Sequence, residues 1–230
     1  MNRFEWDLRY PDARGLPGRT YLMGGSLRGP VAVPGTYRAR LRVGQEVSKS
    51  QSFEIHKDPR IATTPEEFQE QFDLLLRIRD RLSKVHEAIA SSEELKDELE
   101  RLEGRATAKA ELADVGRKSR EITQKLQEVL DELYEPRFIG VDDQLLLFPL
   151  KLNARLASLG GVVASAETSP TAAAHEVFRD LSSRLDTELG KLQRIRENDL
   201  AALNRLAQER GMAVVSSMLR FGSDLRGSRR

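Results

Sequence analysis

The residues of this chain that could carry metal chemistry lie far apart in the sequence. The three histidines, His56, His86 and His175, are isolated, and none belongs to an HExxH or similarly paired motif. A zinc site needs three or four ligands that converge on one point. We therefore predict no metal site, and we expect His56 to lie at the end of a strand.

Asp142 and Asp143 are neighbouring carboxylates that precede the apolar run Leu145–Phe148. Two carboxylates on either side of a sugar cleft are the groups that hydrolyse glycosides. Nothing in the sequence predicts such a cleft, however, and acidic side chains near the start of a helix are favoured by the helix dipole. We interpret this pair as helix-terminal charge.

Gly160-Gly161 is a glycine pair within an apolar, helix-like segment. It lacks the GxxxxGK[ST] frame of a phosphate-binding loop and does not follow a predicted strand. Close packing of two helices at this point is the better explanation.

Two surface features could bind ligands. Arg38, Arg40 and Arg42 form a basic row that could meet phosphates, and Trp6, Tyr10 and Tyr37 could form a carbohydrate platform. The simpler interpretation is that the arginines lie on the solvent-exposed face of a strand and that the aromatic residues form the apolar face of the sheet. We predict no catalytic residue, no cofactor site and no binding of nucleic acid, and hence no enzymatic activity.

The composition is typical of a helical protein with charged surfaces. Hydrophobic residues make up 39% of the 230, charged residues 32% and aromatic residues 6%, and the net charge is +1. A net charge this close to zero creates no long-range electrostatic attraction to nucleic acid or to an anionic membrane. No run approaches the roughly 20 apolar residues of a membrane span, and the charged first ten residues predict no signal peptide. The chain contains no cysteine and therefore forms neither a disulfide nor a thiolate site.

The first 59 residues carry the period-two pattern of strands. Alternation predicts one strand over 4–10, a second over 37–43 and a return strand over 47–55, with a tight turn at Gly44-Gln45. Residues 20–23 could add a short strand. An immunoglobulin-like sandwich needs about seven strands. Residues 1–59 therefore predict a partial, antiparallel immunoglobulin-like β-domain.

Residues 60–210 carry apolar positions at helical spacing in four segments. Thr64, Pro65 and Glu67 predict a capped start for the first helix. Its apolar stripe extends from Phe68 to Ile89 and on to Leu102, with or without a kink at Ser91-Ser92. Gly104 is the predicted end of this helix. The second helix is predicted over Thr107–Tyr134. The third is predicted to begin at Pro149 and to carry apolar positions from Leu152 to Val163. The fourth is predicted to begin at Ser169-Pro170, and its apolar stripe extends from Phe178 to Leu206. Four such stripes predict an antiparallel, up-and-down four-helix bundle, followed by a basic tail over 211–230. The fold class is α+β.

Three stretches resemble the C-terminal region of large BNR-repeat, sortilin-like proteins labelled glycosyl hydrolases. They are FEWDLRYPDA at 4–13, GPVAVPGTYRARLRV at 29–43 together with the helix that follows, and the segment from Leu145 to Leu189 that begins LLLFPLKLNARLASLGG. In that family a β-propeller comes first, then an immunoglobulin-like domain, then helices. The resemblance implies that this chain corresponds to the tail of such a protein, without the propeller and without its catalytic residues.

These observations lead to three functional hypotheses. The first is a non-catalytic structural or interaction module related to an exported BNR-repeat protein. The second, which rests on the family label alone, is an accessory region of a glycoside hydrolase, and the third is a free-standing helical adaptor. The partners expected for the first are an upstream β-propeller or β-domain, or a second copy of the chain that associates through the exposed sheet.

Overall fold

The computed structural model describes residues 3–16, 27–137 and 148–215 of the chain. It combines long helices with small antiparallel sheets, with 61% of the residues helical and 8% in strands. This composition confirms the α+β class. Asp142 and Asp143, the possible strand over 20–23 and most of the basic tail lie outside the described residues.

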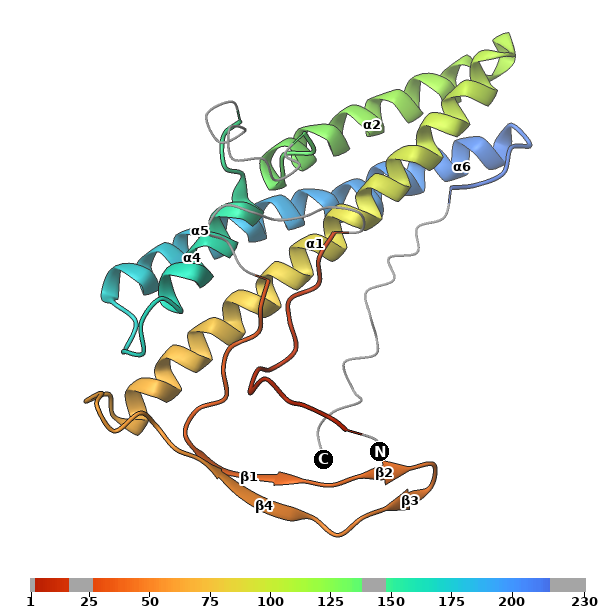
Figure 1. The fold of residues 1–230 in the computed structure, drawn as a ribbon. Helices are drawn as coiled ribbons and strands as arrows, with labels where there is room; N and C mark the ends of the chain where they lie inside the picture. The colour runs from red at the N-terminus through yellow and green to blue at the C-terminus, as the bar shows by residue number, and fades with distance from the viewer. Residues whose placement is uncertain (1–2, 17–26, 138–147, 216–230) are drawn as a thin grey trace.

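The strands form one hairpin that extends away from the helices (Figure 1). β1 (Gly35–Ala39) pairs antiparallel with β4 (Gln51–Ile55), and at the tip β2 (Arg42–Val43) pairs with β3 (Glu46–Val47). Gly44 has φ 59° in the tip turn, a left-handed conformation that glycine adopts without steric cost. The hairpin predicted over 37–55 is therefore confirmed.

A bulge interrupts this hairpin and changes which residues share a face. Ala39 pairs with Gln51 and Arg42 pairs with Val47, so the return strand uses one residue more than the outgoing strand between the two ladders. Val47 consequently lies opposite a member of the arginine row. Alternation along the predicted return strand over 47–55 would place Val47 on the face of Phe53 and Ile55. That expectation is wrong, because the bulge changes the register between Val47 and Gln51.

The strand expected over 4–10 is not present. Only an isolated antiparallel bridge between Arg9 and Val31 remains of it. Leu8 has φ 61°, which interrupts extended backbone, and the facing segment contains Pro30 and Pro34, which cannot donate to a ladder. The period-two pattern identified an extended segment, but not a sheet strand.

α1 (Pro65–Thr107) is a single helix of 43 residues. Its start matches the prediction in detail: Thr64 accepts a hydrogen bond from Glu67 N, and the Glu67 side chain accepts one from Thr64 N. The buried stripe continues through Ser92 to Ala106. The helix therefore passes Ser91-Ser92, and Gly104 is not its end.

The remaining helices follow in two groups. A 3-10 turn, η1 (Ala110–Leu112), leads into α2 (Ala113–Leu133), and α4 (Leu152–Val163) follows the long connection. α5 (Ala172–Arg194), the π-helix η2 (Ile195–Leu200) and α6 (Ala201–Glu209) form one continuous rod. Thr171 caps α5 by accepting from Ala174 N, so the start predicted at Ser169-Pro170 was two residues too early. Likewise α4 begins at Leu152, and not at Pro149.

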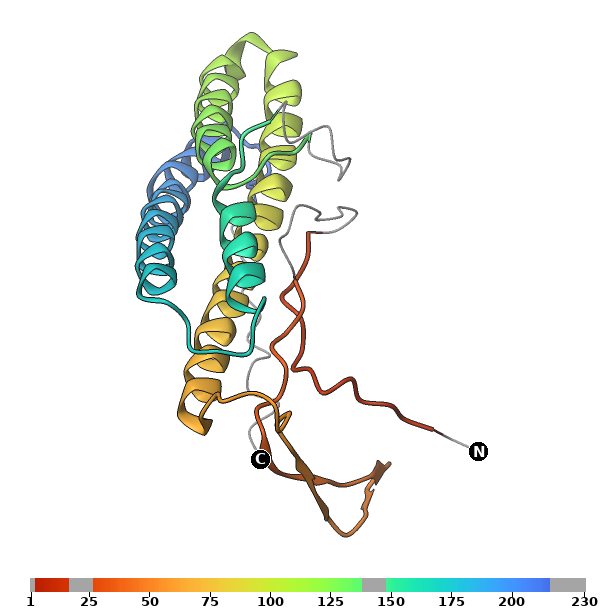
Figure 2. The same ribbon diagram turned by 60° about the vertical axis from the view of Figure 1, so that its left-hand side comes forward.

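The described helices pack as three columns (Figures 1 and 2). α1 and α5 are parallel, because Arg81 bonds Asp186 and, ten residues further along both helices, Ser91 bonds Arg196. α2 and α4 both run antiparallel to α1. α2 covers the C-terminal half of α1, where Glu103 meets Arg120, and α4 covers the N-terminal half, where Gly160 meets Ile78.

This arrangement differs from the expected up-and-down alternation of four helices. The second and third helices in sequence run in the same direction, one after the other along α1. The reason is length: α1 spans about 65 Å, whereas α2 spans about 32 Å and α4 about 18 Å. Two short helices in succession are needed to cover the stripe of one long helix.

The N-terminal segment packs on the outside of these columns and contributes to their core. Ala13 and Leu16 are buried, and Arg14 N donates to Ser83 Oγ on α1 at 3.1 Å. A methyl group at Gly29 would overlap the carbonyl oxygen of Tyr10, so the residue at 29 must be glycine for the two extended segments to meet. These contacts fix the root of the hairpin to the helices.

Candidate functional site: the aromatic hairpin

An aromatic cluster marks one face of the hairpin. Tyr37 and Phe53 are directly opposed across β1 and β4, with ring centroids 5.9 Å apart. Trp6, from the N-terminal segment, meets both rings edge-on at 5.9 and 6.3 Å. Such edge-to-face pairs contribute about 0.5–1.5 kcal/mol beyond the area that they bury.

Local hydrogen bonds hold the polar ends of these rings. Trp6 Nε1 donates to the carbonyl of Arg9 at 2.8 Å, and Tyr37 Oη donates to the carbonyl of Val33 at 2.8 Å. Burial raises the pKa of Tyr37, and a phenolate at Tyr10 would raise it further. Tyr37 therefore stays protonated and keeps its hydrogen bond at neutral pH.

The helices leave most of the apolar surface of the hairpin uncovered. Leu41 is 67% exposed, Val43 66% and Phe4 88%, and Val47, Phe53 and Trp6 are also exposed. Within the described residues, β1 and β4 pair only with each other. Each strand therefore keeps one free edge, next to exposed apolar and aromatic side chains.

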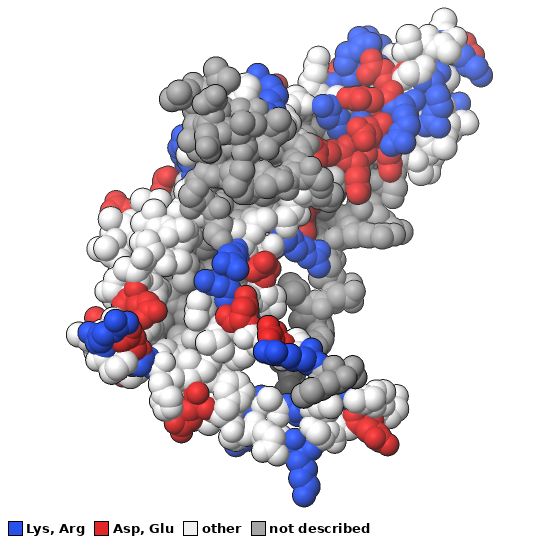
Figure 3. Space-filling model, in the orientation of Figure 1, with Lys and Arg blue, Asp and Glu red and all other residues white. Residues whose placement is uncertain are grey.

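The basic row lies on the other face of the same hairpin. Arg38 pairs with Ser52 and Arg42 with Val47, and all three arginines of the row are exposed. Acidic and basic side chains are much denser at the far end of the molecule, over α1 and α2 (Figure 3). There Glu103 binds Arg120 and Lys118 approaches Glu121.

The remaining sequence candidates do not come together. His56 is exposed beside Glu54, His175 lies 3.3 Å from Glu70, and His86 is buried against α4 and the N-terminal segment. Among the described residues no group of three or more His, Asp or Glu side chains could hold a metal ion.

The structure tests two further predictions from the sequence, one for Gly160 and one for the three aromatic residues. A methyl group at Gly160 would lie 3.4 Å from Ile78 Cγ2, so α4 does pack against α1 at this glycine, although the distance is an ordinary packing contact that does not itself require glycine. Of the three aromatic residues, Trp6 and Tyr37 lie together, whereas Tyr10 stacks edge-on against Phe72 of α1 at 4.8 Å. They form no common platform.

Sequence reasoning missed Arg196 and its surroundings between α1 and η2. One signal was present, because the apolar pattern of the last long helix steps by five positions from Ile195 to Leu200. A step of five does not fit an α-helix, but it fits a turn of π-helix, in which hydrogen bonds span five residues.

Comparison of the chain with protein-family models, curated proteins and solved structures gave no match. None of the described helices combines the length and the apolarity that a membrane crossing requires.

Proposed function

We propose that this chain is a non-catalytic structural and interaction module whose hairpin forms part of a larger, immunoglobulin-like sheet. The observation that carries this proposal is the two-stranded β1–β4 sheet, which combines free edges with a partly uncovered aromatic face. Burial of one large apolar side chain contributes about 1.5–3 kcal/mol. Strands from another polypeptide, or from another part of a longer protein, would supply that burial.

The helices would provide a rigid support for this sheet. Ala13 and Leu16 belong to the same buried core as α1 and α4, so the root of the hairpin is anchored in the helical part. The four helices predicted from the sequence would act in the proposed module as one support of three columns. The resemblance to BNR-repeat proteins favours an upstream β-domain as the natural partner, and an accessory role beside a glycoside hydrolase rests on that resemblance alone.

Without such a partner, the hairpin is expected to pair with a second copy of the chain. We predict that the full chain self-associates as its concentration rises, and that Val43→Lys shifts it toward the monomer. Lysine on an exposed edge opposes strand pairing. Light scattering coupled to size-exclusion chromatography measures both states.

Val162→Lys is the matched control, because Val162 is also 66% exposed but lies on α4. It should leave self-association unchanged. The contradicting result is a wild-type chain that stays monomeric at every concentration and whose Trp6 is protected from a soluble quencher. It would mean that other parts of the same chain already cover the apolar face of the hairpin.

A further inference from the structure

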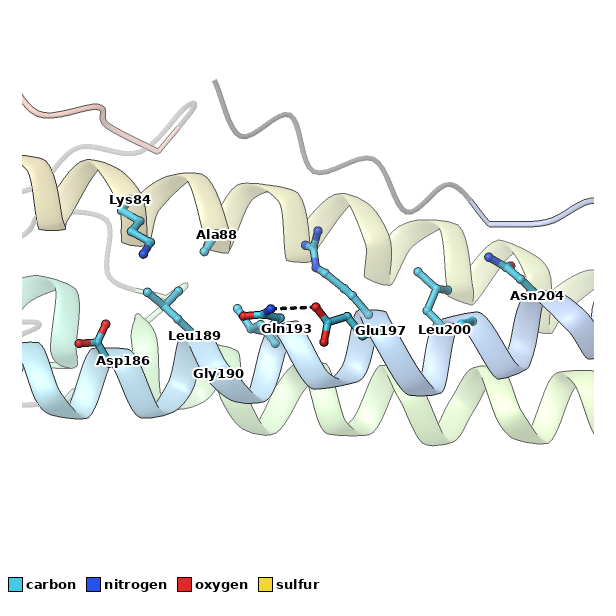
Figure 4. A pocket seen from close by; sticks show the side chains of 12 residues that line it. Lys84, Ala88, Asp186, Leu189, Gly190, Gln193, Glu197, Leu200 and Asn204 are labelled. Atoms are coloured by element: carbon cyan, nitrogen blue, oxygen red, sulfur yellow. Dashed lines mark hydrogen bonds between the residues drawn. The ribbon is translucent and has the colours of Figure 1, made fainter. Parts of the chain in front are cut away.

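A groove of about 750 Å³ runs between the two parallel rods, α1 and α5–η2–α6 (Figure 4). Its size falls in the range of small-molecule sites in proteins. Leu189, Gly190 and Ala201 of the second rod, which all keep accessible surface, give it an apolar wall. Arg196 and Lys84 bring positive charge to it from the two sides.

The π-helix η2 accounts for the position of Arg196. Ile195 and Leu200 are both buried, and the extra residue of the π turn keeps both on the core side of the rod. Arg196 follows Ile195 directly and is consequently half-buried beside α1. π turns are rare and frequently occur at functional sites, where they redirect a side chain.

Arg196 has only neutral partners in the described part of the chain. Its Nη2 donates to Ser91 Oγ at 3.1 Å and lies 3.5 Å from Ser92 Oγ. Burial lowers the pKa of Arg196, as expected for a guanidinium removed from water without a compensating charge. Such a group costs stability unless an anion accepts its hydrogen bonds.

The nearby carboxylates are held by other residues. Asp186 accepts from Arg81 Nη1 at 2.7 Å, and this ion pair lowers the pKa of Asp186. Glu197 accepts from Gln193 Nε2 at 2.8 Å, as Figure 4 shows. Neither carboxylate forms an ion pair with Arg196, so no acidic side chain among residues 3–16, 27–137 and 148–215 occupies the remaining N–H groups of the guanidinium, which we assign to a ligand.

We propose that this groove binds an organic carboxylate that carries an apolar body. The planar fork of a guanidinium matches a carboxylate in geometry, and charge-assisted bonds of this kind are about twice as strong as neutral ones. The apolar body would lie against Leu189, Gly190 and Ala201. A doubly charged phosphate fits less well, because Asp186 and Glu197 also line the groove.

The test uses octanoate as the probe and the full chain in isothermal titration calorimetry. Octanoate is expected to bind saturably at one site per chain, and acetate much more weakly because it lacks the apolar body. Arg196→Met should weaken octanoate binding about tenfold or more, since a hydrogen bond to a charged group is lost. The variant is expected to fold, because a desolvated charge is replaced by an apolar side chain of similar length.

Arg194→Met is the matched control, since Arg194 is exposed two residues earlier on the same rod, and it should leave the affinity unchanged. Lys84→Met tests the other side of the groove and should weaken binding severalfold. The proposal fails if octanoate does not bind saturably, if Arg196→Met binds it as tightly as the parent, or if octylammonium or inorganic phosphate binds equally well.

Discussion

His86 is the buried histidine, whereas His56 is exposed and His175 is partly exposed. His86 is 1% exposed, and its Nδ1 lies 2.5 Å from the carbonyl of Arg14, which requires a proton on Nδ1. Its Nε2 lies 3.4 Å from Asn153 Nδ2, an amide donor, so the neutral ring fits this position. The ring therefore connects the N-terminal segment, α1 and α4.

This environment makes stability depend on pH. Burial lowers the pKa of His86 in the folded chain below its ordinary value of 6.5. The unfolded chain therefore takes up the proton first, and stability is lost as pH falls through about 6.5 toward the folded pKa. Urea unfolding at about pH 7.5 and about pH 5.5 should show a lower free energy of unfolding at the acidic value.

The His86→Gln variant keeps an N–H donor but cannot titrate in this range. It should lose less stability over the same interval, whereas His56→Gln, at an exposed histidine, should behave like the parent. Equal losses in the parent and in His86→Gln would assign the pH dependence to other groups.

Some features of the helices follow from residues close in sequence, and others depend on packing in the core. The capping box of α1 could be predicted because Thr64 and Glu67 act within one turn of the chain. The π-helix η2 was not predicted, although the five-residue step from Ile195 to Leu200 contains it. Its advantage arises only when both residues must face the same core.

We predict that deletion of Asn198, an exposed residue of η2, is tolerated. The deletion places Leu200 four positions after Ile195, so that an ordinary α-helix keeps both in the core. Deletion of the exposed Arg184 within α5 should be far more damaging, because it rotates every later side chain by about 100°.

Thermal unfolding followed by circular dichroism compares the two deletions. The melting temperature should fall by a few degrees for Asn198 and by considerably more for Arg184. A larger loss for Asn198 would mean that the π turn is required for stability and does not simply absorb an extra residue.

At the scale of the whole molecule, the three columns share one core. Leu126 of α2 and Leu185 of α5 are fully buried on different columns. Substitution of either by Ala should lower the free energy of unfolding by about 2–5 kcal/mol. Leu41→Ala, at the exposed hairpin tip, should cost far less in chemical denaturation of the monomer. If the core variants unfold at the parent's denaturant concentration, the packing of the columns is wrong.

The sequence by itself determined the class and the local elements of this protein. Period-two alternation located the hairpin, and three- and four-residue spacing located the four helical segments. Proline and glycine marked several of their limits. These signals are encoded between residues that are close along the chain, so one sequence is sufficient to find them. The helix–helix contact at Gly160 could also be inferred, because a glycine within an apolar helical segment commonly lies where another helix packs.

Tertiary structure alone decided how these elements combine. Spacing cannot show that α2 and α4 follow one another along α1, because that depends on the relative lengths of three helices and on a core shared among them. It cannot show that Leu8 interrupts the first extended segment, or that a bulge moves Val47 to the arginine face. Arg196 became a candidate for the same reason: its charge is unusual only because Ser91 and Ser92, about a hundred residues away in sequence, face it without a carboxylate.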